Sequence, residues 1–167
     1  KNIKRFSKYL DKIYYYKVED LHNNYLDLKN YLNKSNSKIN KKIARFIENH
    51  NYYDKDKLSH ILDTYHREAI HLKLEELCTD SDIVLISDLD EIPDFECTKK
   101  LKEKADLENI IVFKQNEFQY FLNNFSNSNW LGTIASPYKF IKNISLNDLR
   151  FNSKNIPIIY KSGYHFT

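Results

Sequence analysis

The stretch Asp82-Ile83-Val84-Leu85-Ile86-Ser87-Asp88-Leu89-Asp90-Glu91-Ile92-Pro93 joins an apolar run to a cluster of acids. The apolar residues before Ser87 predict a short buried strand. Asp88, Asp90 and Glu91 follow at once, and a carboxylate buried without partners is costly or shifts its pKa. We therefore expect these acids at the C-terminal tip of the strand, where open α/β sheets bind ligands. Clustered carboxylates of this kind suit Mg²⁺ or Mn²⁺, which in turn hold substrate phosphates.

The composition is that of one globular domain spanning residues 1–167. A net charge of +3, with no run of Lys or Arg, is too small to indicate nucleic acid as a partner. Cys78 and Cys97 show no CxxC spacing, which indicates free thiols in a reducing compartment rather than a zinc site or a disulfide scaffold. No apolar run approaches the roughly 20 residues that a membrane-spanning helix needs.

Outward from this stretch, helical and extended patterns alternate along the chain. Residues 54–77 form the clearest helical pattern, and residues 109–114, 130–135 and 156–160 predict further strands. Pro157 indicates that the last of these is an edge strand or that the strand starts there. Residues 13–18 also have strong strand propensity, after an amphipathic helix at 1–12. Residues 19–42 predict a polar surface excursion with one helical turn, and residues 123–129 predict a loop. Helices that alternate with strands favour a mostly parallel α/β sheet flanked by helices.

The helix at 54–77 carries apolar residues on two sides, which predicts that it lies between layers. The polar strip that remains either forms a solvated edge, which we prefer, or points into a cleft. The strip consists of His60, Thr64, Arg67, Glu68, His71 and Glu75.

Several motifs together resemble glycosyltransferase family 17, the family of the β-1,4-N-acetylglucosaminyltransferase that adds bisecting GlcNAc to N-glycans. They are Tyr65-His66-Arg67-Glu68-Ala69-Ile70, the run Ser-Asp-Leu-Asp-Glu-Ile-Pro at 87–93, Trp130-Leu131-Gly132, Asp148-Leu149-Arg150 and the closing Ser162-Gly163-Tyr164-His165-Phe166-Thr167. The family shows Ser-Asp-Val-Asp-Glu-Ile-Pro and Gly-Trp-His-Phe-Ser types of motif, so Leu89, Tyr164 and Thr167 are mild departures. Since the chain begins with Lys1 and contains no Met, we expect a domain truncated at both ends.

The resemblance implies a GT-A-like nucleotide-sugar-binding fold and an inverting transfer of GlcNAc from UDP-GlcNAc to a glycan acceptor. It implies a Mn²⁺ or Mg²⁺ cofactor bound by Asp88, Asp90 and His165, with Asp88 also turned towards the ribose. Two Asp side chains separated by one residue point to opposite sides of a regular strand, so they share a cation only if the strand has ended in a turn. Gly163, just before the late His, allows an unusual backbone angle or a close approach.

Other side chains carry less specific expectations. Glu91 either bonds backbone N–H groups of its loop or faces the acceptor, and we count it with Asp88 and Asp90 as catalytic. Arg67, Arg150 and Lys161 are candidates to bind the donor diphosphate, because cationic donors match phosphate oxygens. An inverting enzyme also needs a base, for which Glu117 and Asp148 are candidates by position. Aromatic residues at 120, 121 and 130 either stack on a sugar or pack in the core.

Two alternatives stay open. The first is a haloacid-dehalogenase-like phosphohydrolase, in which Asp88 would be the nucleophile, although that motif normally lies near the start of its domain. The second is a non-catalytic module that binds a nucleotide sugar, or an inactive fragment. The lack of an anchor favours the cytoplasm of a bacterium or a virus-infected cell as the location, with the Golgi lumen expected for a eukaryotic relative.

Overall fold

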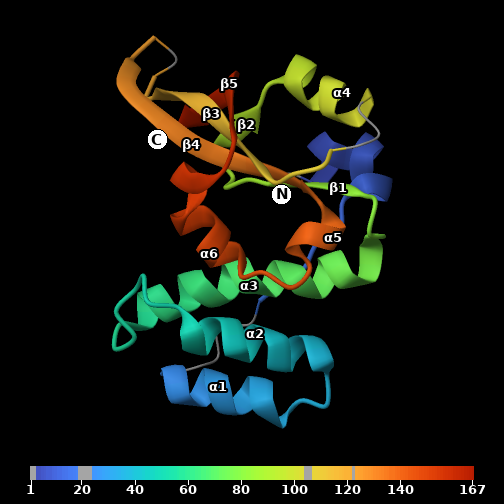
Figure 1. Cartoon of the computed structure of the whole chain (residues 1–167), viewed down its shortest axis with the longest axis vertical. Coiled ribbons are helices and arrows are strands. Elements are labelled where there is room, and N and C mark those ends of the chain that lie inside the picture. The colour runs from blue at the N-terminus through green and yellow to red at the C-terminus, as the bar shows by residue number, and fades with distance from the viewer. Residues whose placement is uncertain (1–2, 19–23, 104–106, 122) are drawn as a thin grey trace.

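The structure is a computed structural model that describes residues 3–18, 24–103, 107–121 and 123–167. A mixed sheet with three short covering helices forms one part of the molecule, and a bundle of α1, α2 and α3 forms the other (Figure 1). The helices are η1 (Ile3–Lys12), α1 (Tyr25–Lys34), α2 (Lys38–Asn49), α3 (Leu58–Leu77), α4 (Phe95–Glu103), α5 (Tyr138–Ile141), α6 (Leu146–Phe151) and η2 (Ser153–Asn155). The strands are β1 (Ile83–Ile86), β2 (Glu91–Pro93), β3 (Ile111–Phe118), β4 (Phe125–Pro137) and β5 (Ile158–Phe166).

The strand order is β1-β4-β3-β5-β2. β1 pairs with β4, β4 with β3, and β2 with β5 in antiparallel fashion, whereas β3 and β5 pair in parallel. The α/β class is confirmed, but the expectation of a mostly parallel sheet is wrong. The physical reason is that β3 and β4 form a direct hairpin and that β1 and β2 each pair with a strand running the other way, so the only parallel pair among the described strands is β3 with β5.

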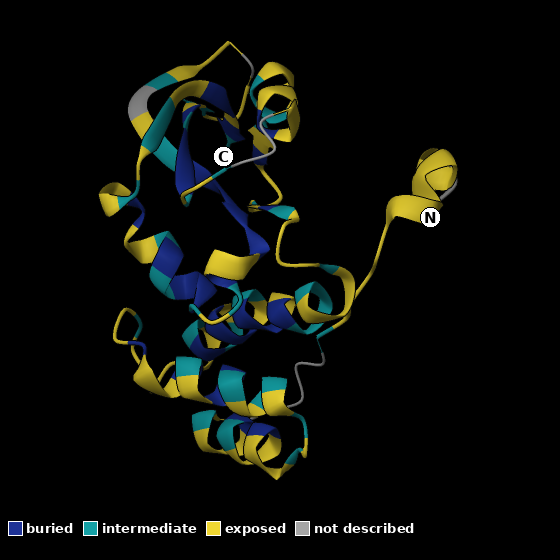
Figure 2. Cartoon of the chain, turned by 45° about the vertical axis from the view of Figure 1, so that its right-hand side comes forward, coloured by how far each residue is buried: buried dark blue, intermediate teal, exposed yellow. Residues whose placement is uncertain are grey.

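Two apolar cores hold the helices on the sheet. α5 and α6 cover one face, where Tyr138 and Leu146 pack with Val112 and Ile134. α4 covers the other face, where Leu101 packs with residues of β3 and β4. Figure 2 shows buried residues along the strands between these layers. The sheet is therefore buried on both faces over its central part, which explains the continuous apolar runs of its strands.

The bundle of α1, α2 and α3 has its own core. Leu28 and Leu32 of α1 are fully buried against Ile43 and Ile47 of α2 and against Tyr65 of α3. The prediction that residues 19–42 form a polar excursion is wrong over 24–42, while 19–23 lie outside the described residues. These helices expose so many Lys and Asn side chains that composition hides the few apolar positions that pack at helical spacing.

The first described part of the chain, residues 3–16, contributes no residue to the three cores, whereas Val18 packs against the core of the bundle. η1 and the following residues extend away from the rest of the molecule in Figure 2, and Phe6, Tyr9 and Leu10 are exposed rather than inward. The expected strand at 13–18 is wrong, because these residues have no strand partner and Ile13 to Tyr16 are exposed. Strand propensity describes side chains that fit a half-buried sheet surface, and it has no effect where no sheet is adjacent.

Two further expectations at the sheet need correction. The predicted loop at 123–129 belongs to β4 from Phe125 onward, because the β3–β4 hairpin extends beyond the core as far as the pair of Phe118 with Phe125. β5 is an interior strand between β3 and β2, so the edge alternative for Pro157 is wrong, whereas its position directly before the first residue of β5 agrees with a strand start. No helix in the described ranges is long and apolar enough to cross a membrane.

Candidate functional site

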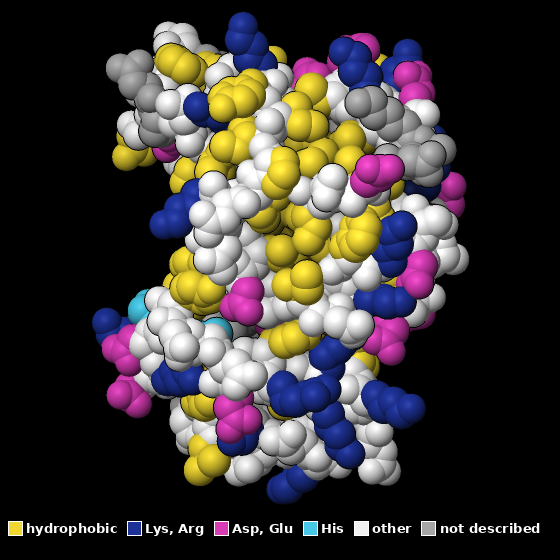
Figure 3. All heavy atoms as spheres, in the orientation of Figure 1, with side chains coloured by type: hydrophobic (Ala, Val, Ile, Leu, Met, Phe, Trp, Pro, Cys, Tyr) yellow, Lys and Arg dark blue, Asp and Glu magenta, His cyan; other side chains and the backbone are white. Residues whose placement is uncertain are grey.

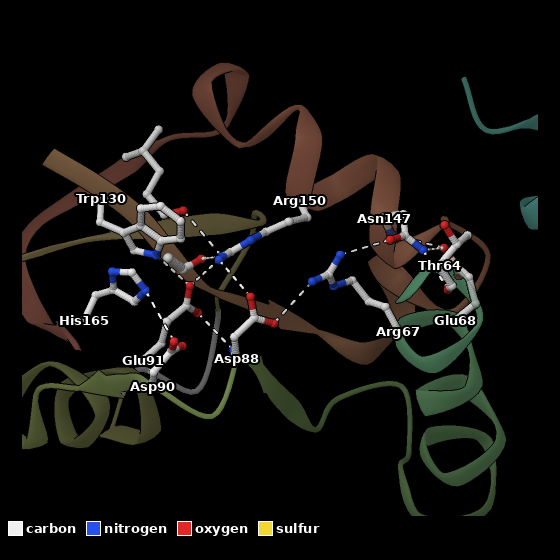
Figure 4. A network of polar contacts seen from close by, with 12 residues as sticks. Thr64, Arg67, Glu68, Asp88, Asp90, Glu91, Trp130, Asn147, Arg150 and His165 are labelled. Atoms are coloured by element: carbon white, nitrogen blue, oxygen red, sulfur yellow. Dashed lines mark hydrogen bonds and ion pairs between the residues drawn. The ribbon is translucent and has the colours of Figure 1, made fainter. Parts of the chain in front are cut away.

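The acidic tip of β1 is a tight turn that leads directly into β2. The Glu91 N–H donates to the Asp88 carbonyl at 3.1 Å and closes the turn, at whose apex Leu89 is fully exposed. The strand therefore ends before the first Asp, as a shared cation would require. In this turn the three carboxylates nevertheless contact different partners, which Figure 4 shows.

Asp88 lies between two guanidinium groups. Its Oδ1 is 3.3 Å from Nη2 of Arg67, and its Oδ2 is 3.1 Å from Nη2 of Arg150. The two arginine side chains come from α3 and α6, on the α6-covered side of the sheet (Figure 4). The repulsion expected among the clustered acids is thus relieved at Asp88 by arginine. Each of its oxygens thus already accepts one charge-assisted hydrogen bond from an arginine.

Glu91 is the buried member of the acidic cluster, with a side chain that solvent does not reach. Oε1 accepts from Trp130 Nε1 at 2.7 Å and also contacts Arg150 Nη2. Oε2 accepts the Asp88 N–H at 3.1 Å, as the loop-bonding alternative predicts. Glu91 is thus a positioning residue that ties the turn, the indole and the guanidinium together.

Asp90 meets the late histidine. Asp90 Oδ2 lies 3.7 Å from Nε2 of His165, although the two residues are far apart in sequence. The pairing of Glu91 with His165 in the β2–β5 register brings them together. Gly163 permits this approach, since its φ is +148° and a Cβ there would lie 2.3 Å from the Ile92 carbonyl oxygen.

His165 is held in a fixed orientation. Its ring stacks on Trp130 with centroids 4.0 Å apart and planes 5° from parallel. The residue is 3% exposed, and its Nδ1 is buried without a hydrogen-bond partner, while Nε2 faces Asp90. A rigid imidazole with one nitrogen aimed at a half-exposed carboxylate is a suitable pair of donors for a divalent ion.

The donor set fits a partly protein-bound metal. Two ligand atoms about 2.1 Å from one ion lie roughly 3–4 Å apart, which matches the Asp90–His165 distance without large movement. Within the described ranges no group of three or more His, Cys, Asp or Glu side chains is arranged around one point. Such a pair therefore suits a metal whose other positions are filled by water and substrate phosphates, as is usual for Mg²⁺.

The two arginines differ in how many donors remain available. Arg150 uses both Nη atoms, on Asp88, on Glu91 and on the carbonyl oxygens of Leu131 and Gly132. Arg67 donates once from each Nη, to Asp88 and to Asn147, and its other N–H groups have no bond among the described contacts. Arg67 also lines a groove of about 620 Å³ between α3 and the β1–β2 turn, which makes it the better phosphate candidate.

The groove and the Asp90–His165 pair adjoin through the turn. The lining of the groove includes Asp88 and Leu89 but neither Asp90 nor His165, so the Asp90–His165 pair lies beside the groove rather than inside it. Tyr53, Asp63 and His66 line the α3 side of the same groove; the full lining is Tyr53, Asp63, His66, Arg67, Ile70, Ile86, Ser87, Asp88 and Leu89. Sequence reasoning missed the first two of these, which carry no motif.

Other predicted residues separate into those near the site and those away from it. Glu117 is the β3 register partner of His165, so it lies in one row with His165 and Glu91 across three strands. Asp148 is in the first turn of α6. Lys161 is exposed, has a φ of +53°, and makes no described contact with the site, so the structure does not bring it together with the acids. The aromatic residues at 120 and 121 are exposed, whereas Trp130 packs on the imidazole.

The polar strip of α3 faces α6. Thr64, Glu68 and His71 are buried there, so the preferred reading of a solvated edge is wrong. Glu68 accepts hydrogen bonds from Ser145 Oγ, from the N–H groups of Leu146 and Asn147 and from Asn147 Nδ2, so its carboxylate caps α6. Burial raises the pKa of Glu68, although these hydrogen bonds oppose the shift.

This buried network continues to the acidic turn. Asn147 bonds Glu68 and also accepts from Arg67, which in turn contacts Asp88 (Figure 4). The chain of contacts places α3 and α6 at a fixed distance from the tip of β1. Sequence reasoning did not predict this network, because a Glu within a helix gives no sign of which distant N–H groups will donate hydrogen bonds to it.

No family model, curated protein or solved structure matches this chain. The structure itself defines the class as an α/β protein with a mixed sheet flanked by helices and a polar site at the β1–β2 turn.

Proposed function

We propose that this chain is the nucleotide-sugar-binding part of an inverting glycosyltransferase with a GT-A-like fold, which transfers GlcNAc from UDP-GlcNAc to a glycan acceptor. The observation that supports it most is the 3.7 Å approach of Asp90 to His165, beside an arginine-lined groove. The donor, the acceptor and the fold family come from the motif resemblance. The geometry supports the chemical requirement that these motifs share, a site for a divalent ion and a diphosphate.

Asp90 and His165 are the residues that would hold Mn²⁺ or Mg²⁺ in this proposal. When bound there, the ion would neutralise the charge that develops on the leaving diphosphate. Asp88 keeps a different role, since its ion pairs with Arg67 and Arg150 fix the groove wall. Trp130 and Glu91 keep the imidazole and the turn in place.

Arg67 would bind the donor phosphates from the groove side. Its guanidinium is anchored by Asn147 and Asp88, which reduces the side-chain entropy that binding must overcome. The N–H groups left over present a fork of donors that matches phosphate oxygens. The groove volume of about 620 Å³ is within the range that small-molecule sites occupy.

Glu117 is the better of the two candidates for the base. Its register position beside His165 places it on the sheet face that carries the proposed metal ligands. It is partly exposed and makes no described ion pair, so its carboxylate is available to accept a proton from an acceptor hydroxyl. Asp148 follows the Ser145 cap in α6 and has no register link to His165.

The phosphohydrolase alternative is weakened by the contacts of Asp88. A nucleophilic carboxylate needs a free oxygen, whereas both oxygens of Asp88 are paired with guanidinium groups that stabilise its negative charge. A non-catalytic binding module has the same geometry as the proposed enzyme. Turnover separates these two readings.

The single tryptophan of the chain provides the test. Because Trp130 stacks on His165, paramagnetic Mn²⁺ bound at Asp90 and His165 should quench its fluorescence, and UDP-GlcNAc should strengthen the quenching. Asp90→Asn, which is close in size, should weaken Mn²⁺ affinity by about a hundredfold or more, whereas Asp56→Asn, at an exposed position outside the site, should not. Equal quenching in both variants would refute the metal assignment.

A second measurement addresses turnover. Wild-type protein with Mn²⁺ and UDP-GlcNAc should release UDP, measured by a coupled assay with and without glycan acceptor. Binding of the donor without release of UDP would reject the enzyme and leave the binding module. Phosphate release from a generic phosphoester, with no donor binding, would favour the phosphohydrolase.

A further inference from the structure

A second pocket lies between α2, the end of α3 and α5. Its volume is about 390 Å³, and it shares no lining residue with the groove beside Arg67. Four cationic side chains and two carboxylates line it, together with Tyr138, which is 5% exposed. The lining residues are Lys38, Ile39, Lys42, Arg45, Glu75, Asp80, Tyr138, Lys142 and Asn143.

The two carboxylates of the pocket are already paired with two of its cations. Lys42 Nζ lies 3.2 Å from Glu75 and donates to the Lys142 carbonyl at 2.8 Å. Lys142 Nζ donates to both oxygens of Asp80, at 2.8 and 2.9 Å. These contacts fix the walls of the pocket and neutralise both acids.

Two cations remain without a counter-charge. Lys38 and Arg45 are exposed and make no ion pair with any part of the chain that the structure describes. They lie with Lys42 at i, i+4 and i+7 of α2, hence on one face of the helix. Like charges at this spacing destabilise a helix, and an anion bound between them would relieve the repulsion.

The surface view agrees with this charge distribution. Figure 3 shows Lys and Arg side chains gathered at the lower right of the molecule, around the start of α2. Elsewhere on this face dark blue and magenta side chains alternate more evenly (Figure 3). The excess of cations is therefore local to this part of the surface.

We propose that this pocket binds a phosphate ester, with Lys38 and Arg45 contacting the phosphate. A guanidinium fork and an ammonium group together suit a dianionic phosphate better than a carboxylate, because they supply several directed donors. The pocket volume of about 390 Å³ is larger than a bare phosphate requires, so it also has room for the organic group of a phosphate ester beside Ile39.

The test is a titration of the isotope-labelled chain with inorganic phosphate at constant ionic strength. NMR chemical shifts of the backbone amides report the binding. Amides lining the pocket should shift saturably. The double variant Lys38→Ala/Arg45→Ala should weaken binding by about tenfold to hundredfold. Lys41→Ala, an equally exposed cation of α2 that does not line the pocket, should bind as the wild type does. Because all three side chains are exposed, the variants should keep the wild-type melting temperature.

Sedimentation with vesicles of phosphatidylcholine containing phosphatidic acid identifies the source of the phosphate. Vesicle binding that the double variant loses assigns a lipid headgroup, whereas binding of free phosphate without vesicle binding assigns a soluble ester. Shifts that do not saturate, or an affinity unchanged in the double variant, would overturn the proposal. None of these outcomes depends on the Mn²⁺ measurements at Trp130.

Discussion

Replacing Glu91 by Gln tests the centre of the proposed site. The change preserves size but removes the charge from a side chain that is fully buried. Oε1 of Glu91 accepts hydrogen bonds from Trp130 and Arg150, and Oε2 accepts one from the Asp88 N–H. A Gln amide can present its oxygen to only one of these sides, so its NH₂ group faces another donor in either orientation.

The cost follows from these contacts. One buried donor loses its acceptor, and Arg150 keeps Asp88 but loses its second carboxylate. We expect a loss of about 2–4 kcal/mol in the free energy of unfolding. For a chain of this length, that loss corresponds to a fall of roughly 5–15 °C in melting temperature.

Thermal unfolding followed by circular dichroism gives the melting temperature, and Trp130 emission reports the local change. Glu96→Gln, an exposed acid of α4, is the matched control and should change the free energy of unfolding by less than about 0.5 kcal/mol. If Glu91→Gln has the melting temperature of the control and leaves the emission of Trp130 unchanged, the buried network around Glu91 does not contribute the expected free energy of unfolding.

Three further predictions concern the buried Glu68, the buried His71 and Glu117, the proposed base. Glu68→Ala removes the acceptor of four hydrogen bonds at the start of α6, of which Asn147 Nδ2 keeps a second acceptor in the Thr64 carbonyl. The free energy of unfolding, measured by urea titration, should fall by about 3–5 kcal/mol, whereas the exposed Glu76→Ala should show no comparable change. Burial lowers the pKa of His71 from 6.5 to about 4, so the unfolded chain binds a proton at this residue more strongly than the folded chain does. The free energy of unfolding should therefore fall by about 3 kcal/mol as the pH drops from 6.5 to 4. His71→Gln should lose that part of the pH dependence, and an unchanged slope would contradict it. Glu117→Gln should reduce the transfer of GlcNAc, measured as UDP release, by about a hundredfold or more while UDP-GlcNAc affinity stays within twofold of wild type. A matched loss of binding would assign Glu117 to the donor site instead.

Local sequence patterns determined several elements of this protein. The apolar run before Ser87 forms β1, and Asp88 and Asp90 after it lie exposed in a turn as their cost of burial requires, whereas Glu91 is buried at the start of β2. The helical periodicity of residues 54–77 predicts α3 to within a few residues. Gly163 adopts the unusual backbone angle expected of it. These features depend on residues close in sequence, where periodicity and steric preference act directly.

Patterns of the same kind failed where a distant partner decides the outcome. The run at 13–18 has strand propensity without a strand to pair with, and Leu28 and Leu32 are buried only because α2 and α3 pack against them. Direction of pairing is equally non-local, since β5 runs parallel to β3 and antiparallel to β2. Composition and periodicity carry no information on which strands become neighbours.

The candidate site divides in the same way. The sequence alone grouped Asp88, Asp90 and Glu91, because clustered carboxylates beyond a buried strand repel one another unless a cation joins them, whereas only the motif resemblance added His165 to this group. Only the tertiary structure decided that Asp88 pairs with arginines, that Glu91 is buried on Trp130, and that Asp90 alone of the three contacts the imidazole. The physical reason is that the partners of each charge come from α3, α6, β4 and β5, and their positions are set by packing over the whole chain rather than by neighbours in sequence.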